Sequence, residues 1–81
     1  MKMSCCSLTS VSNLTRCQVG ALSERADLMQ NGYLEVFSVM QYDWWFIKLR
    51  HYSNGRTLKI QWKPDYYEIS EGKKILKQVS D

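Results

Sequence analysis

The residue pair Asn54-Gly55 constrains the fold of this chain more than any other feature, because it separates two segments in which apolar and polar residues alternate. Asn-Gly is the preferred pair at the centre of a type I′ β-turn, where both residues need positive φ. The sequence therefore predicts an antiparallel hairpin from Trp44 to Lys63, with a two-residue loop that places Ser53 opposite Arg56.

The predicted register of this hairpin separates an apolar face from a basic and aromatic face. Counting outward from the turn places Arg50 opposite Lys59, and it places His51 on the inward face near the turn. The inward face then collects Ile47, Leu49, Leu58, Ile60 and Trp62. The outward face collects Phe46, Lys48, Arg50, Tyr52, Thr57, Lys59, Gln61 and Lys63. Because a slip of one residue would expose the apolar set, the turn and the pattern support the same pairing.

The segments before the hairpin predict a helix and a further strand. Between Ala21 and Gln30, apolar residues recur on one helical face, with Ser23 as a candidate N-cap and Asn31-Gly32 as a stop. Tyr33 to Gln41 is rich in β-branched and aromatic residues and is apolar on both faces, which indicates a central strand.

The segment after Pro64 is open to two interpretations. Ser70 is a candidate N-cap for a last helix that would turn Ile75, Leu76 and Val79 inward. Alternatively, Glu71-Gly72 would turn a second hairpin between residues 66–70 and 73–79. We take the helix as the first choice.

The length of 81 residues predicts one domain. Residues 1–19 are rich in Ser, Thr and Cys and lack periodicity, so we expect a flexible N-terminal arm before a single globular domain over 20–81. The predicted fold class is α+β, with an antiparallel sheet of three or more strands (33–41, 44–52 and 56–63) covered on one face by short helices.

The charges and the aromatic residues point to a binding surface. The net charge is +3, yet residues 44–64 hold five cations and no acid, whereas the remainder holds six cations and eight acids. Three Trp, five Tyr and two Phe exceed the need of a minimal core. Because Arg50 opposite Lys59 costs up to about 1 kcal/mol without a counter-charge, we expect an anionic group at this face.

Catalytic and metal chemistry find little support in the sequence. His51 is the single histidine, and the chain has no nucleophile elbow, no phosphate-binding glycine loop and no carboxylate pair at a telling spacing. Cys5, Cys6 and Cys17 match neither a complete disulfide framework nor the paired spacing of a zinc site. We therefore expect no enzyme activity, no metal, no cofactor and a reducing, cytoplasmic location, and we find no apolar segment long enough to span a membrane.

Part of the chain resembles a Src-homology-3 domain. The run Asp43-Trp44-Trp45, a strand, an Asn-Gly turn, another strand and Pro64-Asp65-Tyr66-Tyr67 is similar to the second half of that family, and Ala21-Leu22 and Asn31-Gly32-Tyr33 are similar to its opening. The resemblance spans residues 20–69 and implies an alternative fold, an all-β five-stranded barrel. It also implies a groove for proline-rich helices lined by Trp44, Pro64 and Tyr67.

These observations predict a non-catalytic protein-binding module of the adaptor or inhibitor type. The expected partner is an acidic or proline-rich protein, and a nucleic acid is the alternative, because sheets also hold single strands with aromatic side chains beside cations. Assembly into a homo-oligomer through an open edge strand is a further option. The expected contact residues are Trp44, Phe46, Lys48, Arg50, Tyr52, Lys59, Lys63, Pro64 and Tyr67.

Overall fold

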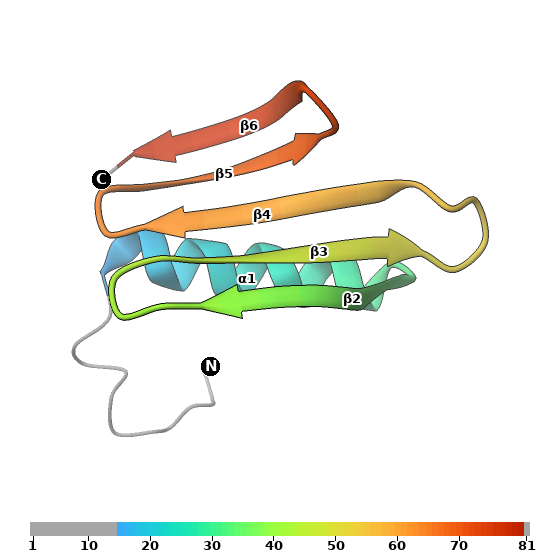
Figure 1. The fold of residues 1–81 in the computed structure, drawn as a ribbon, viewed down its shortest axis with the longest axis horizontal. Coiled ribbons are helices and arrows are strands. Elements are labelled where there is room, and N and C mark those ends of the chain that lie inside the picture. Colours follow the sequence, from blue (N-terminus) through green and yellow to red (C-terminus); the bar gives the residue numbers. More distant parts are fainter. Residues whose placement is uncertain (1–14, 81) are drawn as a thin grey trace.

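The computed structural model describes residues 15–80, which form one helix and a five-stranded antiparallel sheet (Figure 1). The elements in chain order are α1 (Arg16–Gln30), β2 (Tyr33–Met40), β3 (Trp45–His51), β4 (Thr57–Lys63), β5 (Tyr66–Glu71) and β6 (Lys74–Ser80). Each strand pairs with the next, so the sheet order is β2-β3-β4-β5-β6. This confirms the predicted α+β class. The sheet is open, which differs from the closed barrel of the alternative.

The helix α1 begins at Arg16, five residues earlier than predicted. Thr15 is the N-cap, because its hydroxyl accepts a hydrogen bond from the backbone N–H of Gln18 at 2.9 Å, whereas Ser23 lies inside the helix. Residues 16–19, which the sequence assigned to the arm, therefore belong to the helix. The rest of that predicted arm, residues 1–14, lies outside the described residues.

The core lies between α1 and one face of the sheet. From the strands it takes Tyr33, Trp45, Ile47, Leu49, Leu58, Ile60, Trp62, Tyr67 and Ile69. The helix adds two small buried residues, Cys17 and Ala21, which let it approach the sheet closely. At the neighbouring Gly20, a Cβ atom would stand 2.8 Å from the ring of Tyr67. Small residues at this contact therefore set the distance between the two layers.

The hairpin between β3 and β4 has the predicted faces with a different register. Four residues, 52–55, separate His51 from Arg56, and the N–H of His51 donates to the carbonyl of Arg56 at 2.8 Å. The type I′ turn is wrong, because Gly55 has positive φ (74°) and Asn54 does not. Instead, the side chain of Asn54 accepts a hydrogen bond from the N–H of Arg56 at 2.8 Å.

The change of register is two residues, and two is the period of a strand. Lys48 now faces Lys59, and Arg50 faces Thr57 instead of Lys59. Every side chain of the paired residues 45–50 and 57–62 keeps the face that the sequence predicted, while Tyr52 lies in the loop outside the ladder. The inward face of the hairpin is confirmed, and Ile47, Leu49, Leu58, Ile60 and Trp62 are all buried.

The strand β2 lies at an edge of the sheet, not in its centre as predicted. A bulge between Glu35 and Phe37 shifts its register against β3. As a result Leu34, Phe37 and Val39 share a face with Arg50, Lys48 and Phe46, their respective partners. The apolar residues on both faces of β2 therefore need another explanation than burial on both sides.

The C-terminal segment forms the second hairpin, β5 to β6, so the helix favoured for residues 70–79 is wrong. The turn contains Gly72 with φ of 60°, a conformation that glycine adopts without strain. The inward positions Tyr67 and Ile69 pair with the core residues Trp62 and Ile60 of β4. Residues 74–80 pair with β5 instead of forming the helix, and Ile75 and Leu76, which the helix would have turned inward, are exposed.

Candidate protein-contact surface

The face of the sheet that points away from α1 is called the open face here, and Figure 1 shows the helix lying along the opposite side. Its residues alternate along each strand with those of the core. One row across the strands consists of Phe37, Lys48, Lys59 and Ser70. The next row consists of Val39, Phe46, Gln61 and Glu68. The basic and aromatic residues predicted from the hairpin therefore meet on this face.

Three rings form an aromatic cluster on the open face: Phe37, Trp44 and Phe46. The ring of Phe46 lies at the centre, with its centroid 5.8 Å from that of Phe37 and 6.2 Å from that of Trp44. The planes of Trp44 and Phe46 are nearly parallel, at 7°. Phe37 is 52% exposed, while Trp44 and Phe46 are half-buried. The cluster thus exposes apolar surface to solvent, while its three rings remain packed against one another.

Cations surround this cluster. The ammonium group of Lys59 lies 5.4 Å from the ring centroid of Phe46, a distance at which a cation is attracted to the ring. Lys48 stands between Phe37 and Lys59 in the same row, and Lys63 lies 5.9 Å from the ring of Tyr66. Two cations of the open face, Lys59 and Lys63, therefore lie directly beside aromatic rings of the same face.

The open face has an excess of positive charge. It carries Lys48, Arg50, Lys59 and Lys63 against one acid, Glu68. Within residues 15–80 the ion pairs join other residues: Arg25 with Glu35, Arg56 with Glu71, and Lys77 with Glu24. The direct opposition of Lys48 and Lys59 costs up to about 1 kcal/mol in the isolated chain. An anionic partner at this face would remove that cost.

Three of the predicted contact residues do not join the cluster. Tyr67 is buried beneath α1, and its hydroxyl lies 3.3 Å from a carboxylate oxygen of Glu24. Tyr52 belongs to the β3–β4 loop and stacks on His51 with centroids 5.2 Å apart. Pro64 is exposed in the turn between β4 and β5. Because Trp44 and Tyr67 lie on opposite faces of the sheet, the groove implied by the Src-homology-3 resemblance is not assembled.

Both ring nitrogens of His51 contact backbone groups of the chain. Its Nδ1 lies 3.1 Å from the backbone nitrogen of Ser53, which donates to it, and its Nε2 lies 3.1 Å from the carbonyl oxygen of Asn31. A Nδ1 that accepts leaves Nε2 as the protonated nitrogen, which then donates to Asn31. His51 thus connects the end of α1 with the β3–β4 loop, and both ring nitrogens have partners.

Sequence reasoning missed two aromatic residues of the open face. Phe37 reaches the cluster because the bulge at Val36 changes which side chains of β2 share a face with Phe46. Bulges leave little trace in the residue pattern of a strand. Tyr66 lies opposite Lys63, and the choice of a helix at residues 70–79 over the second hairpin left Tyr66 without a predicted strand. Had the second hairpin been chosen, the alternation of side chains along β5 would have placed Tyr66 on the open face.

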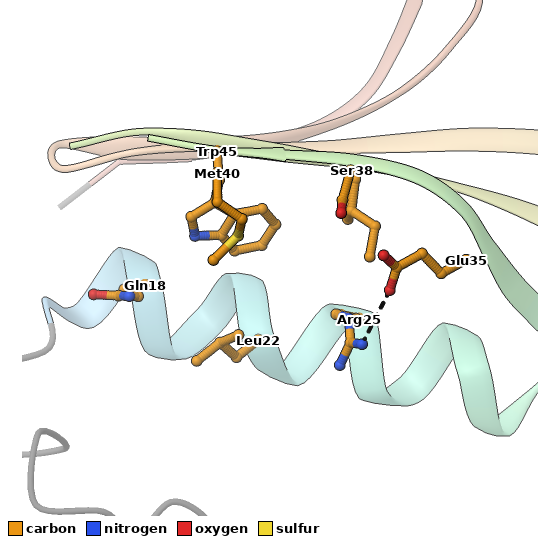
Figure 2. Close-up of a pocket in the computed structure, with 8 residues that line it drawn as sticks. Gln18, Leu22, Arg25, Glu35, Ser38, Met40 and Trp45 are labelled. Atoms are coloured by element: carbon orange, nitrogen blue, oxygen red, sulfur yellow. Dashed lines mark hydrogen bonds and ion pairs between the residues drawn. The ribbon is translucent and has the colours of Figure 1, made fainter. Parts of the chain in front are cut away.

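A groove lies on the other side of the sheet, between α1 and the edge strand β2 (Figure 2). It has a volume of about 210 Å³. Its apolar walls are Leu22, Met40, Trp45 and Ile47. At one end the guanidinium of Arg25 bonds the carboxylate of Glu35 at 3.3 Å, as the dashed line in Figure 2 marks.

Shifted pKa values mark contacts between α1 and the sheet and one contact within the sheet. Burial, and then the nearby Glu24 carboxylate, raises the pKa of Tyr67 above its ordinary value. A hydrogen bond from Lys77 to Glu24 raises the pKa of Lys77. Two hydrogen bonds from Arg56, at 2.8 and 3.1 Å, accompany a lowered pKa of Glu71. Glu24 joins α1 to Tyr67 of β5 and Lys77 of β6, and Arg56 joins the β3–β4 loop to Glu71 of β5. These pKa shifts therefore reflect contacts that stabilise the fold.

Among residues 15–80, no group of three or more His, Cys, Asp or Glu side chains is placed to hold a metal ion. No helix in the same range is long and apolar enough to cross a membrane. Comparison with known protein families, with curated proteins and with solved structures found no match. The fold and surface define a small α+β domain with an exposed aromatic cluster, and the function has to be argued from that surface.

Proposed function

We propose that this chain is a non-catalytic protein-binding module of the adaptor or inhibitor type, which docks an acidic protein on its open face. The observation that carries the proposal is the aromatic cluster of Phe37, Trp44 and Phe46 beside the opposed cations Lys48 and Lys59. Central aromatic anchors with charged surroundings are typical of residues that supply most of the energy of a protein interface.

The charge of the open face supports an acidic partner. Four cations stand there against Glu68, and Lys48 and Lys59 face each other directly. Charge complementarity increases the rate of association and selects among partners. A partner that places a carboxylate between Lys48 and Lys59 would also relieve their repulsion, which the free chain bears.

The environment of His51 supports a non-catalytic role. Both ring nitrogens are engaged by backbone groups of Ser53 and Asn31, so the ring acts as a connector between α1 and the hairpin. A general base needs one ring nitrogen directed at a substrate. The contacts of this residue thus agree with the proposal of a binding module.

Single-stranded nucleic acid is the second candidate, because rings beside cations on a sheet also suit stacked bases. The arrangement of the rings favours a protein. Trp44 and Phe46 stack on each other, and Lys59 lies over Phe46, so parts of these ring faces are already engaged within the chain. Stacking of successive bases requires ring faces that are open to the base.

The test is capture of proteins from a nuclease-treated extract of the cells that express the chain. The wild type is compared with Lys48→Glu/Lys59→Glu on the open face and with Arg16→Glu/Lys73→Glu as the matched control. Arg16 lies at the start of α1 and Lys73 in the β5–β6 turn, both exposed, and the change in net charge is the same. We expect the wild type and the control to retain one set of acidic proteins that the open-face variant loses.

Equal capture by all three proteins would contradict the proposal. A parallel measurement addresses nucleic acid, with a single-stranded DNA oligonucleotide as the probe. Tight retention of the oligonucleotide that falls steeply with salt, together with no protein capture, would establish the second candidate instead.

A further inference from the structure

The edge strand β2 exposes apolar side chains on both of its faces. Five of the eleven large apolar side chains that are exposed in residues 15–80 lie on β2 or in the turn after it, which makes this edge the main apolar surface. They are Leu34 (56% exposed), Val36 (47%), Phe37 (52%), Met40 (72%) and Tyr42 (101%). An edge strand also presents unpaired backbone N–H and C=O groups, which invite pairing with another strand.

The two edges of the sheet differ in charge. The residues of β2, 33–40, include no Lys, Arg or Pro, and their single acid, Glu35, is paired with Arg25 of the same chain. The opposite edge strand, β6, carries Lys74 and Lys77, and Lys73 precedes it. Lysine on an edge strand is a usual protection against pairing with other chains. By this criterion β6 is protected, and β2 is not.

The neutrality of β2 indicates which partner it fits. An interface with two-fold symmetry brings the same surface of two copies together, so the surface must complement itself. The open face would place Lys48 and Lys59 against the cations of a second copy, and the β6 edge would do the same with Lys74 and Lys77. The β2 edge brings apolar side chains and paired charges together, without net repulsion.

We propose that two copies of this chain pair antiparallel along their β2 strands, which joins the two sheets into one of ten strands. This assembly goes beyond the binding of an acidic protein and uses the β2 edge of the sheet, which shares Phe37 with the aromatic cluster. An axis perpendicular to the sheet keeps both helices on one side and both open faces on the other. The clusters around Phe37 and Phe46 of the two copies then belong to one continuous surface.

The groove beside β2 gives the helix side of this contact a specific role. Met40 lines the groove together with Leu22 and Trp45, and its side chain is 72% exposed (Figure 2). A side chain of the added strand that points to the helix side enters this groove. In the pair, β2 of the second copy therefore runs along the side of the groove that is open in the single chain.

Sedimentation velocity of the full chain in reducing buffer tests the proposal, at concentrations on the order of 1 μM to 1 mM. We compare the wild type with Val36→Lys/Met40→Lys on the β2 edge and with Ile75→Lys/Leu76→Lys on the β6 edge. All four residues are exposed, and the charge change is equal. We expect a dimer for the wild type and the β6 variant, and a dissociation constant at least about tenfold higher for the β2 variant.

Hydrogen exchange of the wild-type chain gives a second measurement that does not depend on the folding of any variant. Amides of residues 33–40 should gain protection as the concentration rises, whereas those of residues 74–80 should not. A wild type that stays monomeric over the whole range would overturn the proposal. So would a folded β2 variant that dimerises as the wild type does, or protection that rises at β6 instead.

Discussion

The two faces of the sheet differ although they are built from alternating residues of the same strands. The covered face holds Trp45 and Trp62 stacked at 6.3 Å, with Leu49 and Ile60 fully buried between α1 and the strands. The open face holds the aromatic cluster and the opposed Lys48 and Lys59. The covered face accounts for stability. The open face keeps like charges together at a cost, and this is the observation behind the proposed contact with another molecule.

The largest expected effect separates neighbouring residues of β4. Ile60 is fully buried, and Ile60→Ala should lower the free energy of unfolding by about 2–5 kcal/mol, because it removes apolar contacts and leaves a cavity. Its neighbour Gln61 points to the open face, and Gln61→Ala should change stability by less than about 0.5 kcal/mol. Urea denaturation measures both. Similar losses in the free energy of unfolding for the two variants would show that both faces contribute equally to stability.

The next effect concerns the contact between α1 and the covered face. Tyr67→Phe removes the hydrogen bond to Glu24 and should cost about 0.5–1.5 kcal/mol at neutral pH. The loss should be visible as a lower midpoint in thermal denaturation. Tyr52→Phe, in the exposed loop, serves as the control and should leave the midpoint unchanged.

The pH dependence of the free energy of unfolding gives a second test of the contact between Tyr67 and Glu24. The folded-state pKa of Tyr67 is raised above its ordinary value of 10.0, so the folded chain holds this proton more tightly than the unfolded chain. The resulting stabilisation is complete below pH 10 and is lost as the pH rises through the folded pKa. The raised pKa of Lys77 acts in the same direction. We expect the unfolding free energy of the wild type to decline more steeply in this range than that of Tyr67→Phe, and parallel profiles would refute the assignment.

The smallest effect distinguishes stability from binding on the open face. Lys48→Glu replaces the like-charged pair with Lys59 by an ion pair, and it should stabilise the chain by a few tenths of a kcal/mol at low salt. The same change should weaken binding of an acidic partner. Chemical denaturation at low and high salt checks the first part. A destabilised variant would mean that the two lysines do not repel each other in the free chain.

The sequence predicted the faces of the hairpin better than its turn. The alternation of Ile47 and Leu49 with Lys48 and Arg50 holds for any register that changes by two residues, so the error in the turn moved no side chain to the wrong face. Asn54 misled the prediction because its side chain stabilises this loop by a hydrogen bond, without adopting positive φ. Periodicity is therefore the stronger signal, and turn chemistry is the weaker one.

Other features depended on tertiary contacts that the local sequence does not express. The strand β6 formed where Ser70 suggested a helix cap, because residues 74–80 pair with β5 along their length and bring Val79 against the core. The apolar residues on both faces of β2 suggested a central strand, but they belong to an edge. Of the predicted site, Trp44, Phe46, Lys48 and Lys59 come together, while Tyr52, Pro64 and Tyr67 lie elsewhere. The bulge that brings Phe37 to the cluster had no sequence signal.

The most direct test of the contact surface compares Trp44→Ala with Tyr52→Ala, using the captured partner and isothermal titration calorimetry. Both residues are aromatic and lie outside the ladder between β3 and β4, but Trp44 stacks on Phe46 and Tyr52 stacks on His51. We expect Trp44→Ala to lose about 2 kcal/mol of binding energy, a dissociation constant roughly 30-fold higher, and Tyr52→Ala to bind as the wild type does. Equal affinities for the two variants would contradict a contact surface centred on the aromatic cluster.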